Sequence, residues 1–269
     1  MLINVHHETR YTYDQVIAHT IQRLALTPQT LPGQKVMDWT IDAPGIEAAP
    51  SYRDAYGNMI RLCTQTNMQG EMLIVASGTV ETTDKDGVVG RVPGDPPARL
   101  FLRQTPMTKP SKPMMELANG IASAESGEVN IAHRLMSELH NRLKYDVNST
   151  NTGTTAGEAF EAAHGVCQDF THILIGMARH LGIPARYVTG YLLLADEVRA
   201  EAQHAWAEVW VNNLGWIGFD PANNVCPTER YIRLCGGLDA VSAAPIKGLR
   251  IGQANESLSV MVDVQQANQ

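Results

Sequence analysis

The sequence predicts an α+β fold, in which an antiparallel β domain precedes a core of helices and strands. Runs rich in β-branched residues, separated by turn signals, fill most of the first 105 residues. Helical periodicity takes over after them, and strand patterns return after residue 184. The chain has 269 residues, of which 44% are hydrophobic, so it is long enough for one large domain or two modest ones with a sizeable core.

The N-terminal part is predicted to be an antiparallel sheet or sandwich. Strand patterns occupy residues 16–26, 36–41, 59–62, 72–76 and 78–81, with turn residues at 54–58 and 84–87. A Pro/Gly-rich stretch at 92–97 and a second Pro-containing segment at 109–113 are typical of a linker zone. We therefore expect a β-rich domain over residues 1–105 and a catalytic core with a C-terminal extension over residues 106–269.

Helices are expected in the first half of this core. An apolar residue recurs every four positions at Ile131, Leu135, Leu139 and Leu143, and residues 156–163 could form a short helix. The strongest helix is predicted over 167–181, with Cys167 one turn before an apolar stripe that starts at Phe170. Gly182 and Pro184 provide a normal helix stop.

Strands follow at 185–192, 204–211 and 215–219, and an alternating strand is expected at 258–264. The strands at 204–211 and 215–219 are predicted to form a hairpin around residues 212 and 213. His204 and Asp220 are 16 residues apart, so a loop with an odd number of residues places them on one face. The opposite face is then uniformly apolar, which is typical of a core face. A loop with an even number of residues would separate the two side chains.

Three residues at the edges of these elements form a candidate catalytic set: Cys167, His204 and Asp220. A cysteine at a helix N-terminus meets free N–H groups and the positive end of the helix dipole, which favour a thiolate. A histidine and a carboxylate can serve as its base and as the orienter of that base. Each residue also has a plain structural interpretation, as a packed cysteine, a strand end and a turn residue. Asp169 could equally cap the helix or belong to the site.

Composition excludes several other classes of function. The net charge of −7 and pI of about 5.7 argue against a nucleic-acid binder. No apolar run reaches the roughly 18 residues of a membrane span, and the N-terminus lacks a signal-peptide pattern, so we expect a cytoplasmic protein without membrane contact. The four cysteines form no CxxC pair, which favours free thiols. The spacing of Cys226, Cys235 and His204 fits no standard zinc pattern, and no phosphate loop or dinucleotide fingerprint is present, so we expect neither a metal nor a cofactor.

At four segments the sequence resembles the transglutaminase-like superfamily, in its bacterial cysteine-protease-like branch. The segments are residues 165–170, 181–191, 204–210 and 215–221. Residues 52–58 resemble the β-rich region that precedes the core in this branch, and residues 231–264 resemble its C-terminal extension. The resemblance implies a papain-like core in which a helix bearing the cysteine packs on an antiparallel sheet. It also implies that Cys167 is the nucleophile, His204 the base and acid, and Asp220 the orienter.

The expected function is cysteine-dependent hydrolysis of a peptide or protein amide through a thioester acyl-enzyme. The family includes proteases, amidases and transglutaminases, so the resemblance does not identify the substrate. Two alternatives stay open at this point. The protein could transfer the acyl group to an amine, as a protein-glutamine acyltransferase does, or it could be a non-catalytic scaffold that binds a peptide.

Overall fold

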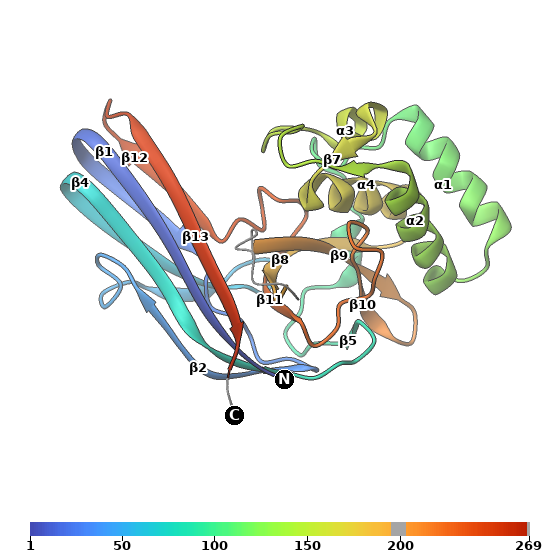
Figure 1. Cartoon of the computed structure of the whole chain (residues 1–269), viewed down its shortest axis with the longest axis horizontal. Helices are drawn as coiled ribbons and strands as arrows, with labels where there is room; N and C mark the ends of the chain where they lie inside the picture. The colour runs from blue at the N-terminus through green and yellow to red at the C-terminus, as the bar shows by residue number, and fades with distance from the viewer. Residues whose placement is uncertain (195–202, 268–269) are drawn as a thin grey trace.

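The computed structural model describes residues 1–194 and 203–267. Within these ranges it contains two main antiparallel sheets and four α-helices (Figure 1). The first sheet, drawn largely in blue and cyan with β12 and β13 in red, lies at the left, and the helices lie at the upper right, above the second sheet. The α+β fold expected from the sequence is confirmed.

The first sheet is built on two unusually long strands, β1 (Leu2–Leu24) and β4 (Met59–Thr82). They pair from Leu2 opposite Glu81 to Leu24 opposite Arg61, with a register shift between Tyr13 and Ile17. The strand expected at 16–26 is therefore the second half of a longer one. Strands β2 (Gln34–Asp42) and β3 (Ser51–Arg53) both pair with β4.

The pairing of strands crosses the boundary expected near residue 105 in both directions. Strand β12 (Ile246–Ile251) pairs with the second half of β1, and β13 (Glu256–Gln266) pairs with the first half. Conversely, β5 (Val88–Gly90) pairs with β10 (Gly215–Phe219) of the second sheet. The C-terminal extension thus returns to the N-terminal sheet, because backbone pairing partners are set by the tertiary fold and not by the local pattern.

The second sheet has the order β11-β8-β9-β10-β5 in the described part of the chain. Its strands are β8 (Ala185–Leu192), β9 (Gln203–Val211), β10 (Gly215–Phe219) and β11 (Tyr231–Gly237), besides β5. One face packs on the helices, α1 (Lys112–Ala124), α2 (Glu128–Arg142), α3 (Ala156–Ala162) and α4 (Cys167–His180). Farther along this same face, Tyr191 and Ile232 join the core of the first sheet. The helices and the first sheet therefore cover neighbouring parts of one face of the second sheet.

The segment expected to be a linker is packed against the core. It contains a short 3₁₀ helix, η1 (Ala98–Leu102), and the beginning of α1. Phe101 is fully buried, with its ring 5.2 Å from that of Trp216 in an edge-to-face arrangement. A two-residue parallel pair, β6 (Lys144–Tyr145) with β7 (His164–Gly165), leads into α4.

In the described ranges, no helix has the length and apolar character needed to cross a membrane. The cytoplasmic location expected from the sequence stays a prediction.

Candidate active site

Cys167 is the first residue of α4, and the turn before it is fixed by Asp169. The Asp169 carboxylate accepts hydrogen bonds from the amide of Val166 at 2.9 Å and from the hydroxyl of Thr150 at 2.7 Å. A β-carbon at Gly165 would lie 2.7 Å from the β-carbon and Oδ2 of Asp169, so the carboxylate can approach only because residue 165 is glycine. Burial raises the pKa of this carboxyl, although the Val166 amide and the Thr150 hydroxyl favour its charged form. Asp169 therefore caps and anchors the helix that presents Cys167.

His204 and Asp220 come together through the register of the β9–β10 hairpin. The strands are joined by the three residues 212–214, and Phe219 pairs with Ala207. This odd loop places His204 and Asp220 on one face, as expected, and His204 Nε2 lies 2.7 Å from Asp220 Oδ2. The opposite face packs on the helices, as its apolar pattern predicts; it carries Ala205, Ala207, Val209, Val211, Ile217 and Phe219.

Asp220 is fully buried, and its carboxylate accepts further hydrogen bonds besides the one with His204. The Tyr231 hydroxyl donates to Oδ2 at 2.8 Å, and the Asn223 side-chain amide donates to the same oxygen at 2.7 Å. The backbone amides of Ala222 and Asn223 donate to Oδ1 at 3.0 and 3.2 Å. Burial alone would raise the pKa of the Asp220 carboxyl, but these donors and His204 hold it below its ordinary value.

Tyr231 and Asn223 were missed by the sequence analysis. Asn223 lies three residues after Asp220 in a turn, and side chains in such turns commonly bond nearby groups, so a local signal was present. Tyr231 lies on β11, which pairs with β8 and not with the hairpin. No local pattern connects it with Asp220.

His204 contacts both of the other candidate residues. It is 8% exposed, and burial alone would lower its pKa; hydrogen bonds with Asp220 and Cys167 outweigh this effect and raise the pKa to about 10. Because Nε2 faces Asp220, Nδ1 is the ring nitrogen left for Cys167. The structure thus brings all three sequence-predicted site residues together, in an arrangement that favours an imidazolium at neutral pH.

The other three cysteines have different surroundings. Cys63 and Cys235 are buried, as expected for Cys63, and burial raises the pKa of the Cys235 thiol to about 12. Cys226 is half-buried, and burial raises the pKa of its thiol to about 11. A thiol in such surroundings is a poor nucleophile at neutral pH, because the thiolate is the reactive form.

A pocket of about 580 Å³ opens beside Cys167 and His204. Gln168 and Tyr187 line it on the side of the second sheet and its helix, and Val260 and Val262 of β13 line it from the first sheet. The volume lies within the range of about 300–1,000 Å³ that is common for ligand sites. In the part of the chain that the structure describes, no group of three His, Cys, Asp or Glu side chains is arranged to hold a metal ion.

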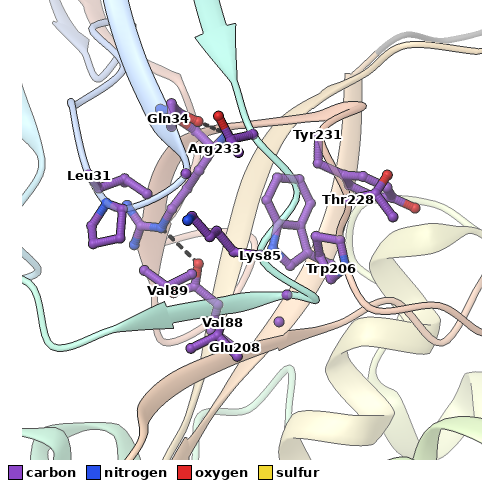
Figure 2. A pocket seen from close by; sticks show the side chains of 16 residues that line it. Leu31, Gln34, Lys85, Val88, Val89, Trp206, Glu208, Thr228, Tyr231 and Arg233 are labelled. Carbon is purple, nitrogen blue, oxygen red and sulfur yellow. Dashed lines mark hydrogen bonds and ion pairs between the residues drawn. The ribbon is translucent and has the colours of Figure 1, made fainter. Parts of the chain in front are cut away.

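A second, smaller pocket of about 60 Å³ lies where the two sheets meet (Figure 2). Glu208 lies beside it and pairs with Arg186 at 2.5 Å and with Arg233 at 2.9 Å. The side chain of Gln34 accepts from the backbone amide of Arg233 at 2.7 Å and donates to its carbonyl at 2.9 Å. Neither Cys167 nor His204 lines this pocket; the ion pairs link three strands of the second sheet, and Gln34 of β2 joins that sheet to the first.

Two family models match the chain. Residues 115–221 match the transglutaminase-like superfamily, and residues 3–81 match the bacterial transglutaminase-like N-terminal region. The first match contains all three candidate catalytic residues, and the second covers β1 and most of β4.

Individual relatives agree with these matches. An uncharacterized protein of Mycobacterium leprae is 27% identical over 278 residues, covering 97% of this chain and 98% of its own. A protein-glutamine gamma-glutamyltransferase of Pseudomonas aeruginosa is 30% identical over 128 residues, covering 41% of this chain and 19% of its own. The solved structure of a "Putative Cysteine Protease from Cytophaga hutchinsonii" shares the fold with a TM-score of 0.78 at 24% identity, over 100% of this chain and 91% of that one. The chain thus carries a transglutaminase-like core at residues 115–221, preceded by a bacterial transglutaminase-like N-terminal region at residues 3–81.

Proposed function

We propose that this protein is a cysteine-dependent hydrolase of peptide or protein amides that works through a thioester acyl-enzyme. The observation that carries the proposal is the position of His204, which is buried between the Asp220 carboxylate and the Cys167 thiol. A buried histidine bonded to an anion on one side and to a thiol on the other supports a thiolate–imidazolium pair.

The first half of the reaction forms the acyl-enzyme. The Cys167 thiolate attacks the amide carbonyl carbon, and the oxyanion that develops can be stabilised by the first amides of α4, those of Cys167 and Gln168, which precede the first amide bonded to the Val166 carbonyl. The C–N bond then breaks, and the His204 imidazolium gives its proton to the leaving amine. The products of this half are a free amine, a thioester on Cys167 and a neutral imidazole.

The second half returns the enzyme to its starting state. Neutral His204 removes a proton from water, and the oxygen attacks the thioester carbonyl. The C–S bond breaks, which releases a carboxylic acid and restores the thiolate beside an imidazolium. Throughout, Asp220 holds the ring with Nε2 toward itself and keeps Nδ1 directed to the reaction.

Acyl transfer is the second candidate function, and the relationship to the Pseudomonas aeruginosa glutamyltransferase favours it. The first half-reaction is the same, but a primary amine resolves the thioester in place of water. Relative access of amine and water to the acyl-enzyme decides between the two outcomes.

The first test measures the reactivity of the four thiols. Iodoacetamide at pH 6 should label Cys167 faster than Cys63, Cys226 and Cys235, as located by peptide mass spectrometry. Equal and slow labelling of all four would contradict an activated thiolate and leave the scaffold as the better description.

The second test separates hydrolysis from transfer. A panel of peptide amides and a glutaminyl peptide is incubated with the wild type and with Cys167→Ala, in the presence and absence of a primary amine. Hydrolysis predicts acid products that need Cys167 and do not contain the amine. A product that incorporates the amine would contradict hydrolysis and support acyl transfer.

A further inference from the structure

One wall of the pocket beside Cys167 comes from the C-terminal strand, which belongs to the other sheet. Val260 and Val262 of β13 line the pocket, and they pair with Thr9 and His7 of β1. Side chains two residues apart in a strand share a face, so Leu258 and Val264 belong to the same row. The face of β13 that meets the pocket is therefore a continuous row of aliphatic side chains.

One end of this row packs in the protein core, and the other end is exposed beside the pocket. Val262 and Val264 pack against the core of the first sheet. Val260 is 48% exposed and Leu258 is 56% exposed, although both are aliphatic. Contiguous exposed apolar side chains beside a cleft are typical of a binding surface.

The segment between β11 and β12 adds a second apolar wall. Ala240, Val241, Ala244 and Pro245 line the pocket, and Val241 is exposed. Among the described residues that line it, none is Asp, Glu, Lys or Arg. The polar lining includes Gln168 and Gln203, which adjoin Cys167 and His204 in the chain. Polar groups thus accompany the reacting residues, and the distant segments supply aliphatic ones.

A pocket of this composition favours one class of substrate. An aliphatic side chain that enters it removes apolar surface from water on both partners, whereas a charged side chain would lose hydration without an ionic partner among the described lining residues. We propose that the acyl part of the substrate carries an uncharged aliphatic side chain next to the scissile amide, and that β13 recognises this side chain through Val260 and Val262. This inference rests on the proposed function of Cys167.

Three alkylating probes with one reactive group test the proposal on the full-length protein. They are the chloromethyl ketones of N-acetylleucine, N-acetylaspartate and N-acetyllysine, which carry the side chain on the acyl side of the reactive carbon, and plain iodoacetamide is the reference. In each reaction the Cys167 sulfur forms a C–S bond and the halide leaves, so the rates of the three probes differ only through the attached side chain. After each rate at Cys167 is divided by the rate with free glutathione, the leucine probe should exceed both charged probes by roughly tenfold or more.

The lysine probe separates the pocket from the overall charge of the protein. A net charge of −7 repels the aspartate probe and attracts the lysine probe, whatever the pocket contains. If the lysine probe is the fastest of the three, the long-range field explains the preference and the proposal is overturned. Equal rates for all three probes overturn it as well.

A matched pair of variants assigns the preference to β13. Val260→Asp places a carboxylate in the pocket wall and should lower the leucine-to-iodoacetamide ratio by roughly fivefold or more. Met261→Asp is the control, because Met261 is the next residue, is 52% exposed and faces the other side of the strand. Equal losses in both variants, or no loss in Val260→Asp, would rule out recognition by this wall.

The experiment distinguishes failure of this inference from failure of the proposed function. Slow and unselective labelling of Cys167 by plain iodoacetamide contradicts the activated thiolate. Fast and selective labelling without a leucine preference leaves the thiolate intact and contradicts only the aliphatic substrate.

Discussion

Replacement of Asp220 by asparagine removes the negative charge behind His204 and keeps the size of the side chain. Asp220 is fully buried, and its Oδ2 accepts from His204 Nε2, the Asn223 amide and the Tyr231 hydroxyl. Burial alone lowers the pKa of His204, and it is the bonds with Asp220 and Cys167 that raise this pKa to about 10. Without the carboxylate charge, less opposes the effect of burial, so the pKa of His204 falls and the imidazolium becomes less stable.

The size of the effect follows from the thiolate fraction. An unassisted thiol with a pKa of about 8.5 is ionised in roughly one molecule in 300 at pH 6. A thiolate in an ion pair is intrinsically less nucleophilic than a free one, with a Brønsted coefficient of about 0.4–0.5, which offsets part of this factor. We expect Asp220→Asn to label with iodoacetamide at pH 6 about 10- to 100-fold more slowly than the wild type.

The assay is the rate of Cys167 alkylation between pH 5 and 10, followed by peptide mass spectrometry. Asp239→Asn is the matched control, because Asp239 is also a buried carboxylate but bonds Ser242 and does not bond His204. Thermal unfolding of both variants checks that they fold. An unchanged rate at pH 6 in folded Asp220→Asn would refute the argument that the Asp220 charge supports the ion pair.

The same pair predicts a pH dependence of stability. The pKa of folded His204 is raised, so its contribution to the free energy of unfolding is complete below its ordinary pKa of 6.5 and is lost as the pH rises through about 10. The pKa of folded Asp220 is lowered, so its contribution is lost only in acid, as the pH falls below the ordinary range of a carboxyl. The stability difference between the wild type and Asp220→Asn, measured by urea unfolding, should therefore narrow between pH 6.5 and 10. A constant difference would contradict the raised pKa.

Three further variants probe the surroundings of the site. Tyr231→Phe removes one donor to Asp220 and should slow Cys167 labelling less than Asp220→Asn does. If both variants slow the labelling equally, the hydroxyl and not the carboxylate charge determines the ion pair. Glu208→Gln leaves two buried guanidiniums without their shared anion and should cost about 3–5 kcal/mol in urea unfolding, whereas a loss below about 1 kcal/mol would contradict the ionic role. Gly165→Ala overpacks the helix start and should lower the free energy of unfolding by about 1–3 kcal/mol, while Gly157→Ala, in α3 with ordinary contacts, should be neutral or stabilising.

The elements around the candidate catalytic residues could be predicted because their signals are local. The helix expected at 167–181 is observed as Cys167–His180, and the strand expected at 185–192 is observed over the same residues. Gly182 has a φ of +76°, as a glycine that ends a helix commonly does. The common face of His204 and Asp220 followed from the two-residue period of a strand and from an odd loop, and both are local properties.

The remaining structure depends on contacts between distant segments. No local pattern in the sequences of β12 and β13 predicts that these strands pair with the two halves of β1. Composition alone assigned the segment around Phe101 to a linker, although Phe101 packs on Trp216. The donation from Tyr231 to Asp220 requires the position of β11 beside β8, which no periodic pattern contains.

These distant contacts make the first sheet part of the candidate active site. Strand β11 carries Tyr231, and two residues later the backbone of Arg233 is held on both sides by the Gln34 side chain at the start of β2. The first sheet also supplies β13, which forms one wall of the pocket beside Cys167. A fragment that begins at residue 106 would lose Gln34 and the β1 partner of β13, although it would keep all three candidate catalytic residues. The candidate triad can therefore be predicted from the core sequence, but the contacts that support it and its pocket require both sheets.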